Sequence, residues 1–200
     1  MSIASYSDLQ TAISSWLHRS DLSSYTSDFI TLGEGRINSR LRVQAMETST
    51  TVAATSAALP SDYIELKDAY ISSTSPYYHL ERKSAEWIYL KYPDRSSTGI
   101  PKFIAREASS FIFGPAPDSA YSIKLVYYKH FAALSGATNT IFTSYPGLYL
   151  FAALAESAPF LKDDKRVVLW EAKFEELLKQ VQQEDDTEDF SGSLLRMTPG

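Results

Sequence analysis

The chain has 200 residues, of which 44% are hydrophobic and 22% charged, a balance typical of one globular domain or one domain with an insertion. The net charge of −5, without an evident cluster of Lys and Arg, argues against a protein that grips nucleic acid through phosphates. The absence of cysteine excludes disulfides, thiolate metal sites and a cysteine nucleophile, and it fits assembly in a reducing cytoplasm.

No segment predicts export or membrane insertion. Residues 1–5 lack a basic region followed by an apolar stretch, so a signal peptide is not expected. The longest apolar run, Leu148 to Ala155, is far shorter than the roughly 20 residues needed to cross a bilayer. The 13 tyrosines have two interpretations, because tyrosine is enriched both in β-strands and where proteins meet.

The first 45 residues predict two helices. Ser7 and Gln10 have the spacing of a capping box, and the helix that follows places four apolar residues on one face: Leu9, Ile13, Trp16 and Leu17. A second helix is expected to begin near Ser27–Asp28, with a buried stripe of Phe29, Leu32, Ile37 and Leu41. Gly33 and Gly35 weaken this helix by about 1 kcal/mol each, but they would let another backbone come close.

Residues 46–144 predict mostly β-structure. Runs rich in β-branched and aromatic residues are expected to form strands over 46–55, 64–71, 103–106, 111–113 and 121–131. In the last run Ile123, Leu125 and Tyr127 alternate with Lys124, Val126 and Tyr128, as in a strand with two unlike faces. Residues 114–118 separate the last two runs and predict a hairpin with a longer loop, and Ser84 is expected to cap a short helix.

The chain returns to helix at Pro146, a residue that the first helical turn tolerates well. This helix should pack through Leu148, Phe151, Ala152 and Ala155, and Pro159 should end or kink it. Asp163–Asp164 is expected to start the last helix, whose apolar stripe consists of Val167, Trp170, Phe174, Leu177 and Val181.

The order of these segments predicts an α+β fold. Residues 1–45 and 145–183 are expected to form an antiparallel helical bundle, with residues 46–144 as a β-rich insertion and residues 184–200 as a C-terminal tail. The side chains expected to hold the helical body together are Leu9, Trp16, Leu41, Phe151, Trp170 and Phe174.

The tail allows two interpretations. Residues 184–189 are acidic except for Thr187, which is typical of a solvated terminus that frays. Alternatively, Phe190, Leu194, Leu195 and Met197 are apolar anchors of an arm that becomes ordered on a partner.

The sequence contains no recognisable catalytic or metal-binding motif. His18, His79 and His130 lie in different predicted segments and never at metal-ligand spacing. Gly33–Glu34–Gly35 resembles part of a dinucleotide loop, but it lies inside a predicted helix and lacks the preceding strand and the third glycine. We therefore expect no metal, no cofactor and no enzymatic activity.

A set of short motifs follows in a fixed order from Tyr6 to Gln183. The motifs include Tyr6–Gln10, Trp16–Leu22, Arg40–Arg42, Leu59–Leu66, Ile100–Phe103, Phe113–Pro117, Tyr145–Tyr149, Leu154–Leu161 and Trp170–Phe174. Each motif is unspecific by itself, but in its order and spacing the set resembles the head-to-tail adaptor (connector) proteins of podovirus-type bacteriophages.

The resemblance implies a structural role in the virion at the head-tail interface. Such adaptors are expected to form a ring of about twelve copies that docks on the portal, extends the DNA channel and carries the tail. C-terminal segments commonly contact the portal, which assigns Phe190, Leu194, Leu195, Arg196 and Met197 as portal-binding residues. Viral DNA would pass through the channel without sequence-specific binding, and the subunits would be made in the bacterial cytoplasm.

Three alternatives remain at the level of sequence. The chain could be another neck or tail-completion component, such as a stopper or nozzle protein. It could be a hydrolase built from scattered carboxylates such as Asp62, Glu65 and Glu81. It could also be a DNA-binding module, which a negligible, salt-insensitive affinity for DNA would exclude.

Overall fold

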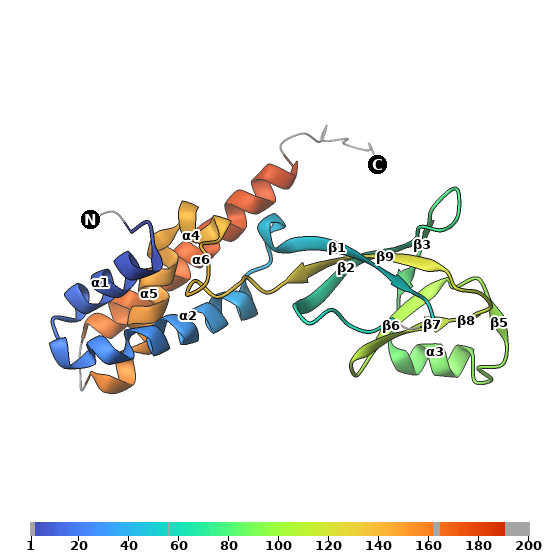
Figure 1. Cartoon of the computed structure of the whole chain (residues 1–200), viewed down its shortest axis with the longest axis horizontal. Coiled ribbons are helices and arrows are strands. Elements are labelled where there is room, and N and C mark those ends of the chain that lie inside the picture. The colour runs from blue at the N-terminus through green and yellow to red at the C-terminus, as the bar shows by residue number, and fades with distance from the viewer. Residues whose placement is uncertain (1–2, 56, 162–164, 191–200) are drawn as a thin grey trace, which may run out of the picture. The chain divides into compact units, whose positions relative to one another are not determined.

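The computed structural model describes residues 3–55, 57–161 and 165–190, and it shows both helices and sheets, which confirms the α+β class (Figure 1). The chain forms two compact units: a helical unit of residues 1–45 and 131–200, and a β-rich unit of residues 46–130. Residues 131–144, predicted as part of the β-rich region, contain a short helix and group with the helical unit.

The first helix, α1 (Tyr6–Leu17), has its N-cap two residues earlier than Ser7 and Gln10 predict. Ser5 is the N-cap: its hydroxyl accepts a hydrogen bond from the backbone N–H of Asp8, and the Asp8 carboxylate accepts one from the N–H of Ser5. A carboxylate at the positive end of the helix dipole is a stronger partner than the neutral Gln10, which explains the choice of box. The helix ends at His18 in the left-handed conformation.

The second helix, α2 (Thr26–Arg40), follows a 3-10 turn, η1 (Ser20–Tyr25), and has no side-chain cap, so the predicted cap at Ser27–Asp28 is wrong. Phe29, Ile37 and Leu41 are buried as predicted, but Leu32 is 54% exposed and Gly33 takes its place on the inner face. A Cβ on Gly33 would lie 3.1 Å from both the Ala152 Cβ and the Ala153 nitrogen, so the glycine permits the close packing of α2 on α5.

Helix α5 (Pro146–Glu156) contacts α1, α2 and α6 (Arg166–Phe190), as Figure 1 shows. Its first residue is Pro146 as predicted, and Pro159 follows it in the 3-10 turn η3 (Ala158–Phe160). Short elements precede and follow the β-rich unit: η2 (Gln44–Met46) and α4 (Thr140–Ser144).

Helix α6 buries Trp170, Phe174, Leu178 and Val181, so the inner position in its fourth turn is Leu178, whereas the predicted Leu177 is half-buried. The proposed start at Asp163–Asp164 lies outside the described residues. The helix continues to Phe190 and therefore includes residues 184–190, which the sequence predicts as tail.

The β-rich unit contains a four-stranded antiparallel sheet in the order β1-β9-β2-β3 and a three-stranded sheet in the order β4-β6-β7. A two-stranded parallel pair, β5-β8, completes it. The bounds are β1 (Glu47–Ala53), β2 (Tyr63–Ile71), β3 (Tyr78–His79), β4 (Glu81–Arg82), β5 (Thr98–Gly99), β6 (Phe103–Glu107), β7 (Ser110–Gly114), β8 (Ala116–Pro117) and β9 (Ser122–Lys129).

Strand β9 shows the predicted alternation, since Ile123, Leu125 and Tyr127 are buried and Lys124 is exposed. The predicted hairpin between the last two strands is wrong, because β7 pairs with β6, whereas β9 pairs with β1 and β2. Two residues between β6 and β7 suffice for a tight antiparallel turn, and no long loop is required. Ser84 caps helix α3 (Ala85–Lys91) as predicted, by accepting a hydrogen bond from the N–H of Trp87.

Candidate interaction surfaces

Charged side chains connect α2 with α6. Arg36 donates hydrogen bonds to Glu171 (3.0 Å) and to Glu156 (3.2 Å), and its guanidinium lies 4.5 Å from the centroid of the Phe174 ring. Arg40 pairs with Glu175 one turn further along both helices, and this interaction lowers the pKa of the Glu175 carboxyl. These pairs add side-chain contacts between α2 and α6 to the packing of the buried apolar stripe of α6.

The segment after α2 is held against the last turns of α6. The backbone N–H of Arg42 donates to the Gln182 side chain (3.3 Å), which donates in turn to the Arg42 carbonyl (2.9 Å). The N–H of Gln44 donates to both carboxylate oxygens of Asp185, at 2.9 and 3.1 Å. Residues 182 and 185 thus have a structural role that the sequence, which predicts a helix only to 183, does not reveal.

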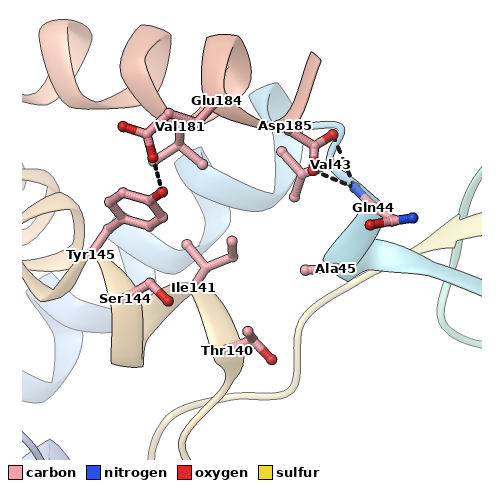
Figure 2. Close-up of a pocket in the computed structure, with 10 residues that line it drawn as sticks. All are labelled: Val43, Gln44, Ala45, Thr140, Ile141, Ser144, Tyr145, Val181, Glu184 and Asp185. Atoms are coloured by element: carbon pink, nitrogen blue, oxygen red, sulfur yellow. Dashed lines mark hydrogen bonds between the residues drawn. The ribbon is translucent and has the colours of Figure 1, made fainter. Parts of the chain in front are cut away.

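A pocket of about 420 Å³ lies beside these contacts, and we call it the acidic pocket. Figure 2 shows Val43, Ile141 and Val181 facing its interior, with Glu184 and Asp185 along one side. Its complete lining is Val43, Gln44, Ala45, Thr140, Ile141, Ser144, Tyr145, Val181, Glu184 and Asp185.

The Glu184 carboxylate of the acidic pocket is held in place by neutral donors. Glu184 accepts hydrogen bonds from the Tyr145 hydroxyl and from Gln180 (2.8 Å), and these bonds lower the pKa of Glu184. A lowered pKa keeps this carboxylate ionised at neutral pH, so the pocket combines an apolar interior with a negatively charged edge. Such a combination fits a segment that contains both a basic and an apolar side chain.

A second pocket, of about 390 Å³, lies at the other end of α6, and we call it the aromatic pocket. Arg166 closes one side, since it donates to the Trp16 carbonyl (3.0 Å) and lies 5.2 Å from the centroid of the Trp170 ring. Trp16 packs edge-on against Phe151, with ring centroids 5.5 Å apart. The lining consists of Ser15, Trp16, His18, Arg166, Leu169 and Trp170.

Apolar side chains at the aromatic pocket are unusually accessible. Val168 is 75% exposed and Leu169 is 58% exposed, although both lie in the first turn of α6, next to the fully buried Trp170. Trp16 is 44% exposed. Scattered exposed apolar residues are common, but neighbouring ones beside a hollow with indole walls are typical of a protein contact surface.

The six residues predicted to pack the helical body have unequal environments. Leu9, Leu41, Trp170 and Phe174 are buried, Phe151 is half-buried and Trp16 lies at the surface. The structure brings Trp16, Phe151 and Trp170 to one end of the helical unit, around the aromatic pocket. The side chain of Phe190 and residues Leu194, Leu195, Arg196 and Met197, predicted to bind the portal, lie outside what the structure describes.

The carboxylates considered for a hydrolase have local partners in the β-rich unit. Asp62 accepts a hydrogen bond from the Tyr127 hydroxyl (3.0 Å), Glu65 lies 3.6 Å from the Arg82 guanidinium, and Glu81 pairs with Lys83. Within the described ranges no group of three or more His, Asp or Glu side chains could hold a metal ion. Among the same residues, no helix is long and apolar enough to span a bilayer.

The acidic pocket is the feature that sequence reasoning missed. Val181, Glu184 and Asp185 are spaced i, i+3 and i+4, which places them on one helical face once the helix is known to continue past residue 183. The other apolar walls, Val43 and Ile141, come from segments that lie 138 and 40 residues before Val181 in the chain. No local sequence pattern predicts that these distant segments lie together.

The comparisons with known proteins bear on both units. No curated protein matches the chain. The family model described as SU10 adaptor protein matches residues 4–197, which is nearly the whole sequence. This match confirms the resemblance to phage head-to-tail adaptors that the ordered motifs indicate. The chain therefore belongs to the SU10 adaptor protein family and is a structural adaptor protein of a bacteriophage.

Proposed function

We propose that this adaptor forms a ring of about twelve copies that docks on the portal at the capsid vertex. The ring extends the DNA channel and provides the platform to which the tail or nozzle attaches. The match of the adaptor family to residues 4–197 carries the proposal, because it includes the helical and the β-rich units together. The role requires no catalysis and no cofactor.

The aromatic pocket is the surface through which neighbouring copies make contact in this proposal. Leu169 projects from α6 in the pocket that Trp16 and Trp170 also line, and tryptophan is enriched among the residues that dominate binding energy at interfaces. A modest contact suffices, because a closed ring repeats it at every subunit boundary.

The portal contact in this proposal is the C-terminal segment. Phe190, Leu194, Leu195, Arg196 and Met197 follow the long helix α6 in sequence, so α6 would act as the stem from which they extend. The net charge of −5 suits a channel through which DNA passes, since like charges discourage adhesion of the phosphate backbone.

The test is the mass of the protein in solution, measured by light scattering alone and after mixing with its cognate portal ring. The expected result is a subunit that adds about twelve copies per portal ring. If nothing binds to the portal at several salt concentrations but the cognate tail protein binds, the protein is a neck or tail-completion component such as a stopper or nozzle.

A pair of variants tests the ring contact separately. Leu169→Glu places a charge on the exposed apolar surface and should prevent ring closure on the portal. Leu90→Glu, at a leucine of α3 that is more exposed (74%) than Leu169 (58%), is the control and should assemble normally. Normal assembly of Leu169→Glu would remove the aromatic pocket from the proposed interface.

A further inference from the structure

We propose that in the free subunit the acidic pocket holds residues 194–197 (Leu-Leu-Arg-Met) of the same chain. The segment would occupy the pocket before assembly and leave it when the ring docks. The second half of this inference rests on the proposed function, because the same residues are there assigned to the portal. The first half rests on the pocket and the sequence alone.

Charge complementarity points to this occupant. Residues 184–189 contain five carboxylates: Glu184, Asp185, Asp186, Glu188 and Asp189. None of the ten pocket-lining residues is Lys or Arg, and Arg196 is the one basic residue in the sequence after Lys179. A carboxylate has about four acceptor positions, so Glu184 can bind a guanidinium in addition to the Tyr145 and Gln180 donors that orient it.

The apolar part of the pocket fits the neighbours of Arg196. Val43, Ile141 and Val181 offer aliphatic side chains to a segment in which Leu194, Leu195 and Met197 flank the basic residue. Methionine and leucine adapt well to a shallow apolar hollow of this kind. The segment therefore offers apolar side chains to the interior of the pocket and a basic side chain to its acidic edge.

The length of chain between the two parts permits the contact. Asp185 lies five residues before the end of α6 at Phe190, a distance of about 7.5 Å along the helix axis. The five residues from 191 to 195 span up to about 17 Å when extended. They begin with Ser-Gly-Ser, a sequence that favours a change of chain direction. A tether this short gives an effective concentration on the order of millimolar.

Disulfide trapping tests the contact, because the chain has no cysteine of its own. In the full-length chain, Ser144→Cys in the acidic pocket is combined with Thr198→Cys, which leaves residues 194–197 unchanged. The control combines Thr198→Cys with Ser15→Cys, an exposed serine of the aromatic pocket. Under mild oxidation at low protein concentration, the pocket pair should form an intramolecular disulfide at least about tenfold faster than the control pair.

A third variant identifies the basic residue as the cause. Arg196→Glu, added to the pocket pair, should slow disulfide formation by about fivefold, the order expected when a partly exposed ion pair is lost and replaced by repulsion. Equal rates for the pocket and control pairs would overturn the proposal. Disulfides between chains in place of intramolecular ones would also overturn it, since the occupant would then be a second copy.

Addition of the portal ring separates this inference from the proposed function. Rapid trapping that the portal suppresses supports both. Rapid trapping that the portal leaves unchanged supports docking in the free subunit and counts against the portal as the later partner. Slow trapping overturns the docking whatever the portal does.

Discussion

In the helical unit, Arg36 and Arg40 reach from α2 to carboxylates of α6, whereas in the β-rich unit β9 is joined along its backbone to β1 and β2. A helix satisfies its own backbone groups, so only side chains remain to fix its position on another helix. A strand has open N–H and C=O groups on both edges, and the sheet uses them to fix its register.

The difference between side-chain contacts and backbone hydrogen bonds predicts how each unit responds to substitutions and to pH. The helical unit depends on ionised side chains, among them Glu171, Glu175 and Asp185, to position the surfaces that we assign to partners. The β-rich unit depends on its ladders and on an apolar core that includes Ile123, Leu125 and Phe113. Substitutions and changes of pH should therefore affect the stability of the two units differently.

The largest effect concerns the packed apolar core of the helical unit. Trp170→Ala should lower the free energy of unfolding by about 3–5 kcal/mol, because the indole is 1% exposed and its removal leaves a cavity. Trp16→Ala, at the surface of the same pocket, should cost clearly less. Urea denaturation followed by circular dichroism measures both. Equal losses would mean that the burial of Trp170 does not contribute as the structure indicates.

The next effect concerns close approach between helices, which the helical unit achieves without backbone hydrogen bonds. Gly33→Ala should destabilise by about 1–3 kcal/mol, because the new methyl group meets Ala152 and the backbone of Ala153. Gly35→Ala is the matched control. A Cβ there meets nothing within 4 Å, so the protein should gain up to about 1 kcal/mol from helix propensity. A thermal melt of each variant distinguishes the two signs.

The third effect belongs to the β-rich unit at alkaline pH. Burial, aided by the hydrogen bond to Asp62, raises the pKa of Tyr127 from 10.0 to about 12. A raised pKa in an acidic group means that stability is fully present below pH 10 and is lost as the pH rises through 12. Tyr127→Phe should cost about 0.5–1.5 kcal/mol at neutral pH. It should also remove this alkaline loss, which urea midpoints between pH 8 and 12 would reveal.

The smallest effect belongs to the helical unit at acid pH. The hydrogen bond from Arg40 lowers the pKa of Glu175 below 4.5, so its contribution is present above pH 4.5 and is lost as the pH falls further. Glu175→Gln should cost about 0.2–1 kcal/mol at pH 7. Its urea midpoint should converge with that of the unaltered protein near pH 3, and a difference that persists there would assign the effect to something other than charge.

Several features could be predicted from residues alone because they are local. Ser84 caps α3 through a contact three residues away, and the alternation in β9 follows from the two faces of any strand. The capping box of α1 was misplaced by two residues because both candidate pairs have acceptable spacing, and the stronger acceptor, Asp8, decided between them. The sequence predicts Leu32 in the core because it follows Phe29 by three residues, a helical spacing that does not by itself decide which side chains are buried.

Features that join distant residues were not predictable in this way. The partner of β7 is β6 and not β9, and the sequence of a strand does not indicate which other strand it pairs with. The acidic pocket joins residues 43–45 and 140–145 with the last turns of α6. Likewise, the accessibility of Val168 and Leu169 depends on which side of α6 faces α5, and the burial of Trp170, Phe174, Leu178 and Val181 decides this.

The sequence by itself therefore determined the class, the approximate elements and the family, because composition, periodicity and ordered motifs are properties of the chain. Only the tertiary structure decided which residues form the two pockets of α6 and which strands pair. Those outcomes depend on contacts between segments far apart in the chain, where packing and charge select one arrangement among many that the local pattern permits.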